Sequence, residues 1–288
     1  GTGATAMTAF SLTGLTSGST VTINDAKDAT GGVAALTVGY KALETAATID
    51  VNSVKAAGAV TINNVTAATI DYAKSATSAA AGITTNETTS LNIIAAKDVS
   101  TGAINSSNKL KTLTITGQDA VTTGAVSSTA LETVTVSGVK NIDINSAGAA
   151  FAEAGKLKTV NVTSTTGDSK VGSIGGVSKN NTTDALNITV SAAKAATLGT
   201  VGDATGSGKL GDISVTATDG LLTAGAITGT DAGTITLTST AGAIDGTAAQ
   251  VTVADATGVT VNMTAKTFIT TDGATTGTAI TVQNTGGN

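Results

Sequence analysis

The 288-residue chain contains no histidine, cysteine, proline, tryptophan or arginine. Without histidine it lacks the usual general base and the commonest metal ligand. Without cysteine it has no thiolate nucleophile, disulfide or structural zinc site, and without arginine it has no bidentate clamp for phosphate or carboxylate. Most catalytic arrangements are therefore excluded before any motif is considered.

Aromatic residues make up only 2% of the chain and charged residues 12%, whereas 40% is hydrophobic. The apolar surface lies in small side chains, which suits a thin, repetitive core better than a thick globular one. The hydrophobic content is too high for a disordered segment. The net charge of −5, with lysines scattered singly, disfavours nucleic acid as a partner. No apolar run approaches the ~20 residues of a membrane-spanning helix.

The chain begins with Gly1 and shows no positively charged start followed by an apolar segment. We therefore expect a processed or excised piece of a longer protein. The low charge and the abundance of Thr, Ser and Asn favour a secreted, cell-surface location. We expect one elongated β-rich repeat region over residues 1–288, with residues 75–90 as the place of any subdivision.

Short segments that alternate an apolar residue with Thr, Ser or Asn recur along the whole chain. A period of two, built from residues that favour strands, predicts half-buried β-strands. The clearest segments are Val21–Asn24, Leu36–Val38, Val60–Asn63, Leu91–Ile94, Leu113–Thr116, Val134–Ser137, Val160–Thr163, Ile188–Ser191, Ile213–Thr216, Ile235–Thr238, Val251–Val253 and Val259–Asn262.

One segment is repeated almost literally, as LKTLTITG at 110–117, LETVTVSG at 131–138 and LKTVNVTS at 157–164, with starts 21 and 26 residues apart. A period of about 20–50 residues is typical of solenoids. One such period would hold three short strands joined by turns. Weaker apolar positions between the strong ones would supply the second and third strands, namely Val121, Val126, Leu198, Val201, Leu222 and Ile227.

We predict an all-β fold, a right-handed parallel β-helix (β-solenoid) over much of the chain, with tandem β-sandwich domains as the alternative. An immunoglobulin-like sandwich usually buries a tryptophan and has a shorter strand spacing, so the solenoid is preferred. In it, Leu113, Ile115, Val134, Val136, Val160 and Val162 point inward and the intervening Thr and Asn point out. The Ala-rich segment Ala147–Ala154, followed by Gly155, predicts one short helix, and Ala73–Ala81 is a weaker helix candidate.

The Leu-Lys/Glu-Thr-Leu/Val-Thr/Asn-Ile/Val-Thr/Ser repeat, on an Ala/Thr/Gly/Val background without Cys or Pro, resembles bacterial surface-layer (S-layer) proteins and related type I-secreted β-strand-repeat surface proteins. The resemblance is compositional over the whole chain and at motif level only in the three repeats. It implies β-solenoid regions, assembly into lattices and calcium binding. The calcium-binding nonapeptide of this secretion class, Gly-Gly-x-Gly-x-Asp, does not follow Gly31-Gly32 or Gly175-Gly176.

Acidic residues in turns are the first candidates for chemistry. Asn24, Asp25 and Asp28 share one short segment, and Ca²⁺ takes carboxylate, amide and carbonyl oxygens from such loops. We predict these three as calcium ligands, with Asp203, Asp212 and Asp219 as weaker candidates. The alternative is that Asp and Asn simply cap turns.

We predict no enzymatic activity, no catalytic residues and no organic cofactor. A glycosidase needs two carboxyl groups within about 5–10 Å of each other. The four glutamates, Glu44, Glu87, Glu132 and Glu153, are far apart in the sequence, and no cluster of aspartates is expected on one strand face.

Thr112, Thr114 and Thr116 lie on one strand face, as do Thr234, Thr236 and Thr238. Stacked coils would place such residues in columns like those of ice-binding solenoids. Since the coils differ in length, we expect these columns to be irregular. The alternative is that Thr is simply a good polar strand former.

We therefore expect a structural extracellular protein, a self-assembling subunit of a bacterial surface layer or filament. Its partners would be other copies of itself and cell-surface polysaccharide. The alternatives are an adhesin stalk or an ice- or surface-binding solenoid and, ranked lower, a polysaccharide-active β-helix enzyme.

Overall fold

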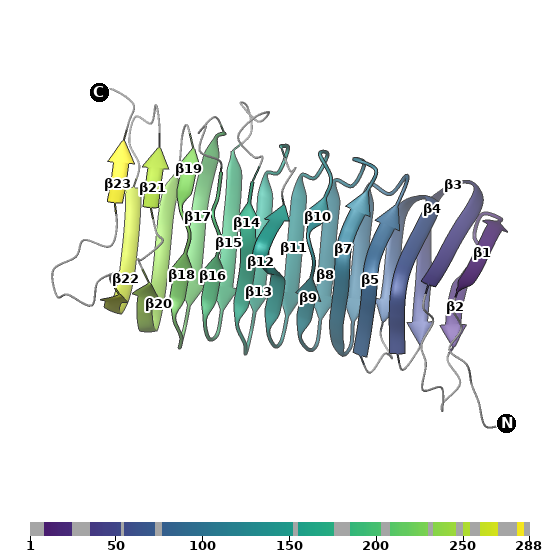
Figure 1. Ribbon diagram of the computed structural model, residues 1–288, viewed down its shortest axis with the longest axis horizontal. Coiled ribbons are helices and arrows are strands. Elements are labelled where there is room, and N and C mark those ends of the chain that lie inside the picture. Colours follow the sequence, from purple (N-terminus) through teal and green to yellow (C-terminus); the bar gives the residue numbers. More distant parts are fainter. Residues whose placement is uncertain are drawn as a thin grey trace.

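A computed structural model of the protein describes residues 9–24, 35–52, 55–72, 77–151, 155–175, 185–202, 208–229, 233–245, 250–253, 260–269 and 281–284. Every regular element in these ranges is a β-strand, and they contain no helix. The strands lie side by side along an elongated body, from the N-terminal end to the C-terminal end (Figure 1). The prediction of an all-β solenoid is confirmed.

The strands are short in the middle of the chain and long near its start. Their bounds are β1 (Phe10–Leu15), β2 (Val21–Asn24), β3 (Ala35–Asn52), β4 (Lys55–Tyr72), β5 (Thr77–Thr85), β6 (Ser90–Ala95), β7 (Asp98–Ser106), β8 (Thr112–Gly117), β9 (Val121–Thr123), β10 (Val126–Ser127), β11 (Thr133–Gly138), β12 (Ile142–Phe151), β13 (Thr159–Ser164), β14 (Ser169–Ile174), β15 (Leu186–Ala192), β16 (Ala196–Leu198), β17 (Leu210–Ala217), β18 (Leu222–Ala224), β19 (Ile227–Gly229), β20 (Thr234–Asp245), β21 (Gln250–Val253), β22 (Thr260–Ile269) and β23 (Thr281–Asn284).

Each coil of the solenoid adds one rung to three parallel ladders, which we call faces A, B and C in the order A, B, C along the chain. Face A contains β2, the ends of β3 and β4, then β6, β8, β11, β13, β15 and β17, and the starts of β20 and β22. Face B contains β9, β16, β18, the starts of β4, β5, β7, β12 and β14, and the ends of β20 and β22. Face C contains β1, β10, β19, β21 and β23 among others. All these pairings are parallel.

The repeated octapeptide forms the core of face A. Leu113, Val134 and Val160 are register partners in successive coils, as are Ile115, Val136 and Val162, and all are at most 1% exposed. The intervening Thr and Asn residues are half-buried or exposed on the outside. The predicted facing of these strands is therefore confirmed.

Faces B and C are made of much shorter strands. Each contributes one or two core side chains per coil, and the weak apolar positions Val121, Val126, Leu198, Val201, Leu222 and Ile227 are all at most 1% exposed. The prediction that they supply the second and third rungs is confirmed. Three small faces around a narrow interior explain how a chain with 2% aromatic residues can fill its core.

A glycine recurs at the corner where face B turns into face C. Gly172, Gly199 and Gly225 follow β-strand residues of face B in successive coils. A Cβ atom on Gly199 would lie 2.6 Å from the nitrogen of Ser173, and one on Gly225 would lie 2.7 Å from the nitrogen of Thr200. The backbone of the preceding coil therefore occupies the space that any side chain here would need.

The predicted helix at Ala147–Ala154 is wrong as far as the chain is described. Ala147–Phe151 belong to β12, where Ala149 pairs with Ser173 and Phe151 pairs with Ile174. Phe151 is fully buried, so its packing in the core outweighs the helix propensity of the alanines. Of the weaker candidate at Ala73–Ala81, residues 77–81 form the start of β5, whereas residues 73–76 and 152–154 lie outside the described ranges.

Among the described residues, Tyr72 is the largest fully buried side chain, and no hydrogen-bond partner for its hydroxyl is found there. Burial raises the pKa of Tyr72 to about 12 from the model-peptide value of 10.0. The unfolded chain ionises this group above pH 10, whereas the folded chain keeps it protonated. Ionisation of Tyr72 therefore leaves the free energy of unfolding unchanged below pH 10. Between pH 10 and about 12 it lowers the free energy of unfolding by about 2–3 kcal/mol.

We expect Tyr72→Phe to stabilise the protein by about 1 kcal/mol at pH 7, because it removes a buried unpaired hydroxyl. It should also flatten the decline in stability above pH 10. Urea unfolding at several pH values between 7 and 11.5 measures both effects. Tyr40→Phe is the matched control, since the Tyr40 hydroxyl donates to the Ser19 carbonyl at 2.6 Å and its loss should destabilise at pH 7. Equal behaviour of the two variants would contradict the assignment.

Candidate functional site

The predicted calcium segment lies at the edge of what the structure describes. Asn24 is the last residue of β2 and is the register partner of Asn52. Asp25 and Asp28 lie outside the described residues, so their role as ligands stays a prediction. Within the described ranges, no group of three or more acidic side chains is placed to hold a metal ion.

Several aspartates bind the backbone of the next coil at the corners. Asp98 Oδ1 accepts a hydrogen bond from the Ala120 nitrogen at 3.1 Å, and Asp168 Oδ1 accepts one from the Ala195 nitrogen at 3.1 Å. Asp212, one of the weaker calcium candidates, accepts one from the Thr234 nitrogen at 2.8 Å. These carboxylates therefore satisfy amides that the turns leave unpaired. Asp219 is exposed after β17, and Asp203 lies outside the described ranges.

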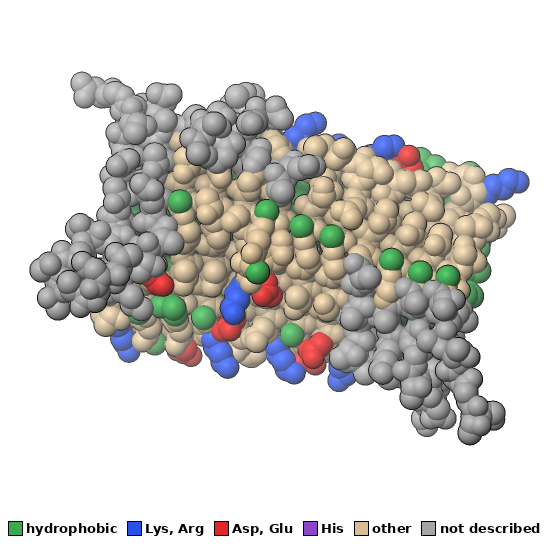
Figure 2. Space-filling view, viewed as in Figure 1, with side chains coloured by type: hydrophobic (Ala, Val, Ile, Leu, Met, Phe, Trp, Pro, Cys, Tyr) green, Lys and Arg blue, Asp and Glu red, His purple; other side chains and the backbone are tan. Residues whose placement is uncertain are grey.

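Charged side chains pair along the corners that border face A. Glu132 Oε1 lies 3.8 Å from Lys111 Nζ in the preceding coil, and Glu132 Oε2 lies 4.0 Å from Lys158 Nζ in the following coil. Glu87 forms an ion pair with Lys109. On the opposite border Asp119 pairs with Lys140, and this hydrogen bond raises the pKa of Lys140. In the view of Figure 2 the charged side chains gather mainly along the edges of the body. Pairs this exposed contribute little stability.

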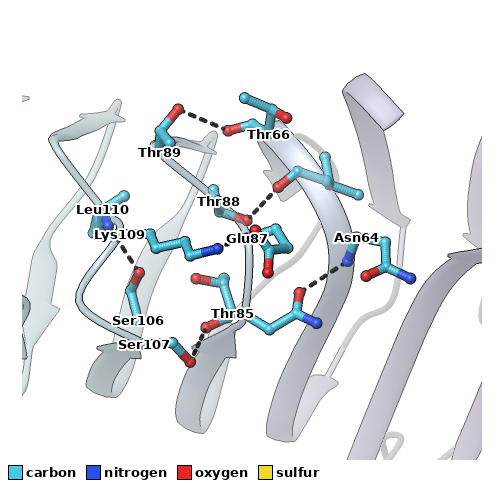
Figure 3. A network of polar contacts seen from close by, with 12 residues as sticks. Asn64, Thr66, Thr85, Glu87, Thr88, Thr89, Ser106, Ser107, Lys109 and Leu110 are labelled. Carbon is cyan, nitrogen blue, oxygen red and sulfur yellow. Dashed lines mark hydrogen bonds and ion pairs between the residues drawn. The ribbon is translucent and has the colours of Figure 1, made fainter. Parts of the chain in front are cut away.

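The corner between faces C and A is held by side chains that reach the preceding coil (Figure 3). Thr88 donates to the Val65 carbonyl at 2.9 Å, and Asn86 Oδ1 accepts from the Asn64 nitrogen at 2.9 Å. Asn64 has a φ of 60°, a conformation that Asn tolerates better than most residues. The polar residues gathered here thus join successive coils, and the contacts are structural.

Asp50 and Asp71 form a carboxylate pair that the sequence did not lead us to expect. They are register partners on adjacent strands at the N-terminal end of face A, so parallel pairing separates their backbones by about 4.8 Å. The Thr22 hydroxyl donates to Asp50 Oδ2 at 3.3 Å. The sequence predicts no cluster of aspartates on one strand face, and this pair arises from two strands because residues one coil apart become neighbours. The side chains of Asp50 and Asp71 are both half-exposed. Neither Glu44 nor Glu87 is a register partner of either aspartate, so neither adds a third carboxylate to this position in the ladder.

Face A carries columns of hydroxyl and amide side chains on its outer surface. The central column reads Thr48, Thr69, Asn92, Thr114, Thr135, Asn161, Thr189, Ser214, Thr236 and Asn262 along the register partners. From β8 to β22 a second column reads Thr116, Ser137, Thr163, Ser191, Thr216, Thr238 and Thr264. Neither series contains a charged residue.

These columns are regular, which corrects the expectation that unequal coils would disrupt them. Extra residues of the longer coils lie at the corners, as between Phe151 of β12 and Thr159 of β13 and between Ile144 and Ala149 within β12. The register of face A continues unchanged across them, for example from Val136 to Val162 to Val190. Most of the variation in coil length is therefore absorbed outside face A, and a bulge at the start of β17 leaves both columns in register.

Comparisons with protein-family models, with curated proteins and with solved structures gave no match. Among the described residues there is no helix long and apolar enough to cross a membrane.

Proposed function

We propose that the protein is a structural subunit that assembles with copies of itself in a surface layer or filament outside a bacterial cell. The observation that carries this proposal is the pair of regular, uncharged columns on face A of a long rod of stacked coils. Flat repetitive faces can bury area against identical faces without specialised loops. In this proposal the acids that hold corner amides have a structural role, and cell-surface polysaccharide is a further partner.

The two ends of the rod also support assembly. Among the described residues, the hydrophobic side chains that pack against the core but are only partly buried are Phe10, Leu12, Leu15, Ile23, Val261, Met263 and Ala265. All of them lie in β1, β2 and β22, the outermost described rungs. No described strand pairs with the outer edge of β2 or β22. Such edges favour continuation by a further parallel rung, from the same polypeptide or from another copy.

Calcium is expected to promote assembly, because the chain carries a net charge of −5 and divalent ions both screen and bridge carboxylates. Negative-stain microscopy and sedimentation should show sheets, fibres or higher oligomers with calcium more than with sodium of equal ionic strength. Asp25→Asn combined with Asp28→Asn should weaken the response to calcium, and Asp98→Asn should not. A chain that stays monomeric at high concentration in calcium would contradict the proposed function.

A second candidate function is binding to ice or another solid surface, and the regular columns of face A favour it. Strand spacing repeats the hydroxyls about every 4.8 Å along the rod and about every 6.6 Å along a strand. A periodic array of this kind suits a periodic surface. Thermal hysteresis of a monomeric sample would favour this candidate over assembly.

A further inference from the structure

We infer that the part of face A from β6 to β22 is the self-association surface, packing against face A of a second copy. The inference rests on the proposed function and names the contact that would carry it. The surface consists of the face A strands β6, β8, β11, β13, β15, β17, β20 and β22, which are eight consecutive rungs. The first rungs are left out because Asp50 and Asp71 place two carboxylates on them.

The distribution of charge on this surface matches that of a protein interface. Its central column contains only Thr, Ser and Asn, whereas the paired charges lie on its borders, with Lys111, Glu132 and Lys158 on one side and Asp119 and Lys140 on the other. Interfaces between proteins likewise have a centre depleted of charge and a polar rim. Two residues depart from this pattern. Asp212 near the start of β17 is charged, and its carboxylate accepts a hydrogen bond from the Thr234 nitrogen. Ile94, the register partner of Thr116, is apolar.

Within the described residues, the hydroxyls in the central column have no hydrogen-bond partner. In the described part of the protein, no hydrogen bond satisfies the side chains of Thr114, Thr135, Thr189, Ser214 or Thr236. Each threonine presents a hydroxyl, which donates and accepts, beside a methyl group. Two such arrays can interdigitate as a dry zipper of short side chains between stacked sheets, about 10 Å apart.

The size of the surface agrees with a stable dimer. Eight rungs at about 4.8 Å and six residues at about 3.3 Å give an area of about 750 Å² per copy. A standard interface buries about 800 Å² per partner. Face B is a poorer candidate, because β9, β16 and β18 are three residues long and its outer column places Asp143 beside Lys170.

The test compares the wild-type protein with Thr135→Lys combined with Thr189→Lys, which puts two positive charges in the middle of the surface. Both side chains point outward, so the fold should survive, as circular dichroism would verify. The matched control is Thr122→Lys combined with Thr223→Lys, on the outside of face B. Sedimentation equilibrium should show the dissociation constant rising about a hundredfold or more for the first variant, since unpaired charges would be buried. It should change less than about threefold for the control.

Single cysteine variants locate the contact, because the chain has no cysteine of its own. Thr189→Cys should be crosslinked between copies by a short bifunctional maleimide, whereas Thr122→Cys should not. Assembly that persists in Thr135→Lys/Thr189→Lys would overturn the inference and leave the proposed function standing. A wild-type protein that stays monomeric would overturn both. A monomer whose thermal hysteresis disappears in that variant would overturn the inference in favour of ice binding.

Discussion

Val136→Asp is expected to destabilise the protein by about 4 kcal/mol or more, or to prevent folding. Val136 is 1% exposed and lies between Ile115 and Val162 of the neighbouring coils. A carboxylate at this position would be buried without a partner, which is among the most destabilising changes a core can undergo. Urea unfolding at pH 7, followed by far-UV circular dichroism, measures the loss.

Thr135→Asp is the matched control, because it introduces the same charge one residue away on the outer surface of β11. Its side chain is half-exposed, and solvent can hydrate the carboxylate. We expect a change of less than about 1 kcal/mol. If the two variants were equally destabilised, the inward and outward assignment of face A would be wrong.

Face A could be predicted from the sequence because its strands are long enough to show a period of two. Leu113–Thr116 and Val134–Ser137 alternate apolar and polar residues, and each alternation appears in the structure as burial and exposure. The repeat also fixed the order of the coils, since Val134 pairs with Leu113 and Val160 as the aligned repeats require. Local pattern and long-range pairing agree here.

Faces B and C were predictable only as isolated apolar positions. β9 and β10 contain three and two residues, too few for any period to be visible. The alanines at Ala147–Phe151 favour a helix locally, but parallel pairing with β14 and burial of Phe151 decide the outcome. Propensity is a weak guide where tertiary packing supplies most of the stability.

The Asp50–Asp71 pair and the regular columns were missed because the sequence reasoning treated residues far apart in the chain as far apart in space. In a solenoid, two residues separated by one coil are neighbours, so Asp50 and Asp71 meet although 20 residues separate them. The same rule creates the columns of face A. The recurring Gly-x-Ile/Val at Gly172, Gly199 and Gly225 was a further signal for the corner between faces B and C. Each of these features becomes visible only when the chain is aligned coil by coil.

Gly199→Ala is expected to destabilise the protein by about 3 kcal/mol, although it adds a single methyl group. The new Cβ atom would lie 2.6 Å from the Ser173 nitrogen and 2.7 Å from the Gly172 carbonyl carbon. Both are backbone atoms of the preceding coil, and the Gly199 nitrogen donates to the Val171 carbonyl at 2.8 Å. The coils would have to separate at a ladder bond, and overpacking of this kind typically costs about 1–3 kcal/mol or more.

Gly39→Ala is the matched control, since a Cβ atom there would make ordinary contacts of 3.6 Å with Asn63 and Thr13. We expect it to change stability by less than about 1 kcal/mol, because alanine also restricts the unfolded chain. In a solenoid each coil contacts only its neighbours, so the effect of Gly199→Ala should be local. Hydrogen exchange should accelerate in β14 and β16 and stay unchanged in β8. Uniform loss of protection along the rod, or equal stability of the two variants, would contradict the close approach of the coils at this corner.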